Sequence, residues 1–141
     1  MSFKLIDHTA DVAVIVEGNS LEEIFISACQ AWKFVTIDSV SEKFESSKKL
    51  IFNSSNYEIL LSDLLTELNF QLLTKKWVFI SIKNILLQEL NSSIQLEVEI
   101  FGEKFDPNKN HIKEEIKAVT FHQMKIEKVD NHFETKIIFD I

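Results

Sequence analysis

Glycine and proline are almost absent from this sequence of 141 residues, which contains two glycines and one proline. Because these residues most often interrupt regular structure, their scarcity predicts long helices and strands whose turns use Asn, Asp and Ser. The length is that of one domain, since domains commonly contain about 100–150 residues. No linker, repeat or low-complexity tract is evident, so we expect a single domain over residues 1–141.

Two segments carry the signature of a helix. Ser20 and Glu23 form a capping box, in which the serine caps the helix start and the glutamate satisfies a free N–H group. Apolar residues then recur at helical spacing, which predicts a helix over residues 21–36. A similar capping signal at residues 55–58 precedes a leucine-rich pattern and predicts a second helix over residues 57–74.

The remaining segments are typical of strands. They cover residues 3–7, 12–17, 44–52, 77–90, 94–100, 115–128 and 133–140. Residues 94–100 alternate cleanly between apolar and polar side chains, and Asp130-Asn131 separates the last two strands as a hairpin turn. This order predicts an α+β fold in which two helices pack on a mostly antiparallel β-sheet sandwich. A parallel βαβ arrangement is the alternative, which the consecutive C-terminal strands disfavour.

The charge balance restricts the class of partner. The sequence has 15 basic residues, all of them lysine, against 22 acidic residues, and its net charge is −7. Arginine supplies the planar fork for phosphates and guanine edges, and a basic face supplies most of the affinity for nucleic acid. We therefore expect no direct, tight binding of RNA or DNA. An acidic surface instead favours cations or a basic protein partner.

Cysteine usage and the N-terminal segment indicate the compartment. The single cysteine, Cys29, excludes an internal disulfide framework and a cysteine-based zinc cluster. Its position on the apolar face of the first predicted helix favours a packed thiol over a nucleophile. We find no signal peptide and no window of about 18 uninterrupted apolar residues, so we expect a cytoplasmic protein without a membrane span.

Two polar clusters could bind a metal ion. Asp7, His8 and Asp11 lie within one predicted turn, where two carboxylates and an imidazole can converge as a hard-metal or acid/base site requires. The alternative is that they are ordinary turn residues. At the other end, the Asp140 carboxylate, the Ile141 carbonyl and the terminal carboxylate offer oxygen ligands of the kind that Ca²⁺, Mg²⁺ or Mn²⁺ takes. A frayed acidic tail is the alternative there.

A third cluster lies at residues 116–122, in the sequence Ile-Lys-Ala-Val-Thr-Phe-His. Along a strand, Lys117 would share a face with Val119, while His122 would lie on the other face. A lysine among apolar neighbours is more often a charge that protects an edge strand than a reactive amine. Taken alone, the cluster leaves both interpretations of Lys117 open.

These segments together resemble the archease family, the accessory proteins of the RtcB-type tRNA-splicing RNA ligase. The resemblance is carried by DHTADV at 7–12, LLTELN at 64–69, KAVTFH at 117–122 and FDI at 139–141. It runs over almost the whole chain, and its strength lies in the order and spacing of motifs that are individually weak. The chain departs from the family pattern at Ala13, where the family usually has glycine, and in its lack of arginine.

The resemblance implies a set of site residues. Asp11, Asp140 and the Ile141 carbonyl would form a divalent metal site, which could hold Ca²⁺, Mg²⁺ or Mn²⁺. Lys117 matches a lysine that the family needs for activity. Further neighbours of the site would be His8, Asp38, Glu67 and His122.

The resemblance also implies a function: a non-enzymatic activator that promotes guanylylation of the RNA ligase and gives it multiple turnover. The alternative is a chaperone-like modulator of tRNA-modification proteins such as a tRNA methyltransferase. A chaperone would expose a sizeable apolar patch and would not need the carboxylates. A metal-dependent hydrolase would need a general base and a substrate pocket. The native metal and the oligomeric state stay open.

Overall fold

The structure, a computed structural model, describes residues 1–6, 11–38, 40, 45–120 and 123–141. Its two helices are α1 (Leu21–Thr36) and α2 (Tyr57–Leu73). The strands are β1 (Ser2–Ile6), β2 (Asp11–Gly18), β3 (Ile37–Asp38), β4 (Ser46–Ser54), β5 (Trp77–Leu90), β6 (Ser93–Lys104), β7 (His111–Ile112), β8 (Ala118–Thr120), β9 (Glu127–Val129) and β10 (His132–Asp140).

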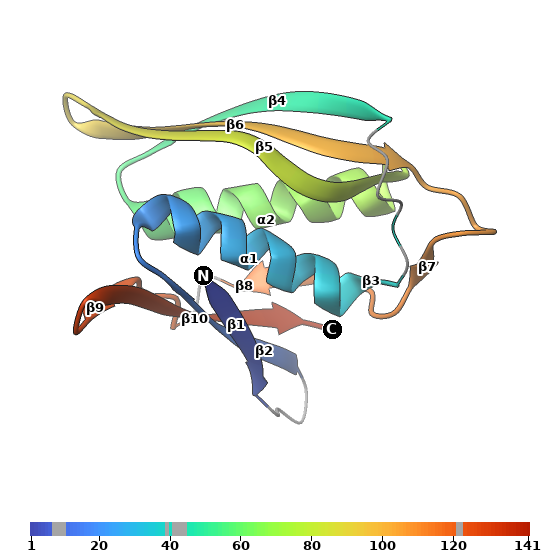
Figure 1. Cartoon of the computed structure of the whole chain (residues 1–141), viewed down its shortest axis with the longest axis horizontal. Helices are drawn as coiled ribbons and strands as arrows, with labels where there is room; N and C mark the ends of the chain where they lie inside the picture. Colours follow the sequence, from blue (N-terminus) through green and yellow to red (C-terminus); the bar gives the residue numbers. More distant parts are fainter. Residues whose placement is uncertain (7–10, 39, 41–44, 121–122) are drawn as a thin grey trace.

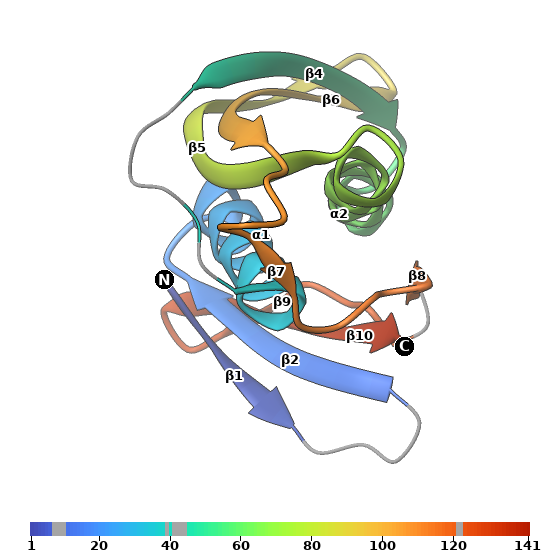
Figure 2. The same cartoon turned by 90° about the vertical axis from the view of Figure 1, so that its right-hand side faces the viewer.

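The two helices lie side by side between two antiparallel sheets (Figure 1). The five-stranded sheet has the order β1-β2-β10-β8, and β9 also pairs with β10. The three-stranded sheet has the order β4-β6-β5, and Figure 2 shows it on the opposite side of the helices. This arrangement confirms the predicted α+β class, with two helices packed on mostly antiparallel sheet.

Both helices begin at the predicted residues, although the cap of the second is Asn56 and not Ser55. Ser20 Oγ accepts a hydrogen bond from the Glu23 N–H at 3.2 Å, and Glu23 Oε1 accepts one from the Asn19 N–H at 3.3 Å. At the second helix, Asn56 Oδ1 accepts from the Ile59 N–H at 2.8 Å. Neither described helix is long and apolar enough to cross a membrane.

One hydrophobic core joins both sheets to the helices. Val14 and Val16 of β2 and Ile137 and Phe139 of β10 point into it, as do the alternate apolar residues of β6. Because successive side chains of a strand point to opposite faces, the residues between these positions lie on the outer face of the five-stranded sheet. This alternation determines which side chains of β2 and β10 can reach a ligand or a partner.

The predicted strand over residues 115–128 is wrong. Among the described residues of this stretch, only Ala118–Thr120 and Glu127–Val129 form strands. These two short strands pair with opposite ends of β10, and the chain between them includes Gln123, whose φ of 64° departs from extended backbone. The predicted hairpin turn at Asp130-Asn131 is present, between β9 and β10.

Candidate metal centre

Asp11 and Asp140 lie directly opposite each other in the pairing of β2 with β10. Opposed residues of an antiparallel pair have Cα atoms about 4.5–5.5 Å apart and project to the same face. The neighbouring pair, Val12 and Phe139, packs against the core, so the two carboxylates lie on the outer face. Asp140 is exposed and Asp11 is half-buried.

The register of this strand pair is set by its apolar residues. Pairing runs without interruption from Phe133 opposite Gly18 to Asp140 opposite Asp11. A slip of one residue would turn the buried side chains of one strand outward and its polar side chains into the core. Residues near opposite ends of the sequence are therefore held together by the packing of the sheet.

Lys117 is attached to the same end of β10 through its backbone. Its N–H donates to the Asp140 carbonyl at 2.7 Å, and the next residue, Ala118, lies opposite Asp140 in the sheet. Lys117 itself sits at a bend before β8 and is exposed. Its ammonium makes no ion pair within 4.0 Å in the described part of the chain. The side chain can therefore reach groups outside this molecule.

Asn69 of α2 fixes the segment that leads into Lys117. Its Nδ2 donates to the Ile116 carbonyl at 2.8 Å, and its Oδ1 accepts from Trp32 Nε1 at 3.3 Å. This amide joins both helices to the site, a role that the sequence analysis did not assign. The sequence feature that could have predicted this role is the asparagine at the end of the leucine-rich segment 64–69.

The other predicted neighbours are not gathered at this point. His8 and His122 lie outside the described residues. Asp38 is exposed on β3, opposite His111 of β7. Glu67 accepts a hydrogen bond from Gln71 Nε2 at 2.8 Å, on the side of α2 that faces β4. The described contacts of Asp38 and Glu67 therefore lead away from the Asp11/Asp140 pair.

The Asp11/Asp140 pair suits a hard divalent cation. Like charges directly opposite on adjacent strands are destabilising, and a cation between them would remove that cost. Asp11 and Asp140 offer carboxylate oxygens, which Ca²⁺, Mg²⁺ and Mn²⁺ prefer as ligands. The residues present therefore fit the metal that the family resemblance implies.

Comparison with known proteins supplies the family. The Archease protein family (MTH1598/TM1083) matches residues 3–141. The chain belongs to the archease family. It is 29% identical to the archease of Methanosarcina acetivorans, over 99% of this chain and 95% of that one, and 32% identical to the archease of Pyrococcus furiosus, over 96% and 95%.

Solved structures agree with this assignment. Protein 1598 of Methanobacterium thermoautotrophicum superposes with a TM-score of 0.82, at 27% identity, covering 99% of this chain and 98% of that one. A Thermotoga maritima protein, described as "an archease, possible chaperone", shares the fold with a TM-score of 0.62, at 23% identity, over 98% and 96% of the chains. Within this archease fold, Ala13 is fully buried and lies between Ile6 and Ile138.

The single cysteine is a packed thiol, as predicted. Cys29 lies on α1 and is fully buried in the core. Burial raises the pKa of its thiol above the ordinary range, because the thiolate would lose its hydration. Since the thiolate is the nucleophile, Cys29 is inert in this archease.

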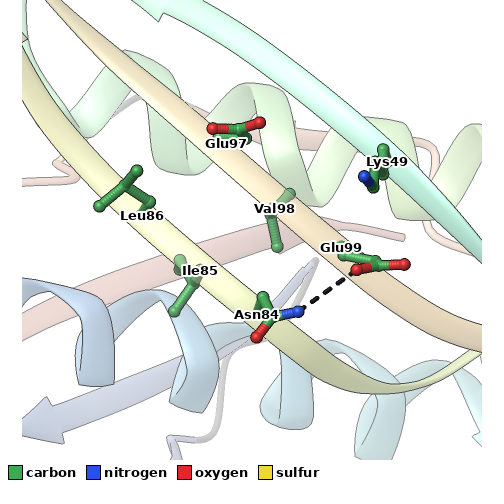
Figure 3. A pocket seen from close by; sticks show the side chains of 7 residues that line it. All are labelled: Lys49, Asn84, Ile85, Leu86, Glu97, Val98 and Glu99. Carbon is green, nitrogen blue, oxygen red and sulfur yellow. Dashed lines mark hydrogen bonds between the residues drawn. The ribbon is translucent and has the colours of Figure 1, made fainter.

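A shallow pocket on the outer face of the three-stranded sheet includes Glu99, a carboxylate that already has partners (Figure 3). Asn84 donates to Glu99 Oε1 at 3.3 Å, and Lys83 lies 3.6 Å from the same carboxylate. Partial desolvation raises the pKa of Glu99, but the Asn84 hydrogen bond and the Lys83 charge outweigh it and lower the pKa overall. Glu99 therefore stays ionised and is poorly suited to be a general acid.

Proposed function

We propose that this archease is a non-enzymatic accessory protein that activates an RtcB-type tRNA-splicing RNA ligase. It would promote guanylylation of the ligase and so support multiple turnover. The observation that carries the proposal is the register of β2 with β10, which sets Asp11 directly opposite Asp140. Membership of the archease family supports the same role.

In this proposal Asp11, Asp140 and the Ile141 carbonyl hold a divalent cation at the edge of the five-stranded sheet. The ion would supply positive charge where the guanylylation reaction brings together several phosphate oxygens. The protein's contribution is to present two carboxylates on a rigid strand pair, with Asp140 exposed to a docking partner. Strand pairing holds such ligands more firmly than a loop would.

Lys117 would act beside the cation. Its backbone is fixed to Asp140, while its exposed ammonium can approach a phosphate or an acidic group of the ligase–GTP complex. A lysine is a compact point charge on a flexible stem, which suits contact with a single oxygen. We expect Lys117→Arg to restore activation only in part, because its planar fork distributes the charge differently.

The partner contacted would be the ligase and not the RNA. The chain carries a net charge of −7 and no arginine, so a nucleic acid backbone would be repelled from most of its surface. The archease alone should therefore show negligible RNA binding. Measurable affinity that falls steeply between low and physiological salt would reveal a basic patch and contradict this expectation. We place the interaction in the cytoplasm.

A chaperone-like role toward a tRNA-modification protein, such as a tRNA methyltransferase, is the second candidate. It is favoured by the description of the Thermotoga maritima structure as a "possible chaperone". Chaperone surfaces expose contiguous apolar patches. Here three exposed apolar side chains, Ile51, Leu86 and Leu90, lie on the outer face of the three-stranded sheet, and others such as Leu5 on β1, Phe34 on α1 and Phe70 on α2 lie on separate elements.

The test is GMP transfer to a purified RtcB-type ligase, measured with sub-stoichiometric archease. Asp11→Asn, Asp140→Asn and Lys117→Ala should each reduce activation at least about tenfold, as expected when a metal ligand or its neighbour is removed. The matched controls are Glu97→Gln and Lys128→Ala, two exposed positions away from the site. Full activation by Asp140→Asn would contradict the proposal. Improved solubility of a methyltransferase by the same variant would favour the chaperone role.

A further inference from the structure

A second group of ligating side chains lies on the outer face of the same strand pair, at the end away from Asp11. Glu17 of β2 lies directly opposite Glu134 of β10. His132 is two residues before Glu134, so its side chain projects to the same face. One ligating atom from each of Glu17, His132 and Glu134 lies within 4.8 Å of the other two. Two adjacent strands thus bring an imidazole and two carboxylates to one point.

The contacts of His132 are incomplete. Its Nε2 is shielded from solvent and forms no hydrogen bond with any described residue. The nearest carboxylate oxygen, Glu134 Oε2, is 3.7 Å away, which is too long for a hydrogen bond. Polar atoms shielded from solvent nearly always have a hydrogen-bond partner, so the unpaired nitrogen indicates that a ligand binds here. Glu17 Oε2 already accepts a hydrogen bond from Ser2 Oγ at 3.4 Å, which helps to orient that carboxylate.

No lysine among the described residues forms an ion pair with Glu17 or Glu134 within 4.0 Å. Lys136 of β10 and Lys4 of β1 both lie opposite Ile15, two residues along the same face from the glutamates. None of the ion pairs within the described part of the chain joins Lys136 to Glu17 or Glu134. Like charges directly opposite on neighbouring strands are destabilising, so a cation bound between Glu17 and Glu134 would relieve their repulsion.

We propose that Glu17, His132 and Glu134 form a metal site for a borderline divalent ion, with Zn²⁺ as the best match. One imidazole and two carboxylates supply three of the four ligands of a tetrahedral site, and water can take the fourth. The imidazole separates this site from the oxygen-only Asp11/Asp140 pair, because nitrogen ligation favours Zn²⁺ over Ca²⁺ or Mg²⁺. Ligands at about 2.0–2.1 Å from a tetrahedral ion lie roughly 3.3–3.5 Å apart, so small side-chain rotations would close the site.

This site is independent of the proposed activation site. Glu17 lies six positions after Asp11 along β2, a span of about 20 Å at roughly 3.3 Å per residue. An ion at Glu17, His132 and Glu134 would cross-link β2 to the start of β10, close to the β9–β10 hairpin. It would stabilise the folded state, because the separate strands of an unfolded chain do not preform the site.

The experiment is a Zn²⁺ titration of the full chain by calorimetry after removal of bound metal with a chelator. Wild type should bind one Zn²⁺ that excess Ca²⁺ does not displace. His132→Gln and Glu134→Gln should weaken this binding at least about tenfold. His111→Gln, which changes an exposed histidine of β7, and Asp140→Asn, which changes the other site, should bind Zn²⁺ as wild type does.

A second set of measurements distinguishes loss of the metal site from loss of the fold. Circular dichroism should report native secondary structure for His132→Gln and Glu134→Gln, and Zn²⁺ should raise the unfolding midpoint of wild type but not of these variants. The d–d absorption of bound Co²⁺ should likewise be lost with His132. Three results would overturn the proposal: no Zn²⁺ binding by wild type, undiminished binding by His132→Gln, or an equal loss in His111→Gln.

Discussion

On the outer face of the three-stranded sheet, Lys49 of β4 lies directly opposite Glu99 of β6. On the outer face of the five-stranded sheet, Asp11 lies opposite Asp140 and Glu17 opposite Glu134. Opposite charges across a strand pair stabilise a sheet by about 0.2–1 kcal/mol, while like charges in the same position are destabilising. One sheet supplies its own counter-charges, and the other brings carboxylates together where an external cation would be favourable.

The buried Glu103 of β6, also in the three-stranded sheet, likewise has its counter-charge within the protein. Its carboxylate accepts hydrogen bonds from Lys109 Nζ at 2.8 Å and Asn110 Nδ2 at 3.2 Å. Removing one partner of a buried charge is costly, which explains why this glutamate has its own lysine and amide. The three-stranded sheet is therefore a structural half of the molecule, while the paired carboxylates of the other sheet are the candidates for function.

The largest expected effect is on packing in the three-stranded sheet. A Cβ at Gly102 would overlap the Trp77 ring and the Val78 carbonyl oxygen, a backbone atom. Gly102→Ala should lower the free energy of unfolding by about 1–3 kcal/mol or more, as overpacking of a core does. Gly18→Ala in the five-stranded sheet, measured by the same urea denaturation, should cost less. Equal stability of Gly102→Ala and wild type would refute this account of the packing.

Charge reversal should make the three-stranded sheet resemble the other one. Lys49→Glu would place a carboxylate directly opposite Glu99. We expect a loss of about 0.5–1 kcal/mol in the free energy of unfolding at low salt, which added salt should reduce. Lys49→Gln, the neutral control, should lie between wild type and Lys49→Glu. If Lys49→Glu were as stable as wild type, cross-strand charge pairs would not distinguish the two sheets.

Removing a carboxylate from the five-stranded sheet should have the opposite sign. In the absence of divalent metal, Glu134→Gln and Asp140→Asn should each raise the free energy of unfolding by about 0.2–1 kcal/mol, because each relieves a like-charge pair. Glu97→Gln serves as the control, since Glu97 lies between Ile51 and Leu86 in its sheet. If both variants are destabilised in metal-free buffer, the carboxylates are stabilised within the protein and need no cation.

The smallest effect is confined to alkaline pH. The hydrogen bond to Glu103 raises the pKa of Lys109 above its ordinary value of 10.5. A cation with a raised folded-state pKa contributes stability that is complete below the unfolded pKa and is lost as pH rises through the folded one. The midpoint of unfolding should therefore fall above about pH 10.5 in wild type, and this component of the fall should be absent in Lys109→Met.

Local signals in the sequence located the helices well, because caps and helical spacing depend on neighbouring residues. Ser20 caps α1 as the pattern predicts, and α2 begins at the predicted residue but is capped by Asn56, one residue after Ser55 of the predicted signal. The stretch 115–128 was predicted wrongly because its two short strands are defined by which end of β10 they pair with. Apolar composition alone does not encode that choice.

The site residues were likewise predictable from local motifs, but their arrangement was not. Asp11, Lys117 and Asp140 stand out in the sequence through their motifs, yet only the strand register places the two aspartates opposite each other. Glu17 and His132 belong to no motif and come together solely through pairing of distant strands. A sequence pattern that could have found them would have to include the register of β2 with β10.

The central claim is that the Asp11/Asp140 pair binds a divalent cation, and thermal unfolding with and without Ca²⁺ tests it most directly. Binding to the folded state alone stabilises it by RT ln(1 + [L]/Kd), so Ca²⁺ should raise the unfolding midpoint of wild type in a concentration-dependent way. The Asp11→Asn/Asp140→Asn double variant should start at a higher midpoint in metal-free buffer and show no response to Ca²⁺. A double variant that responds to Ca²⁺ as wild type does would contradict the account.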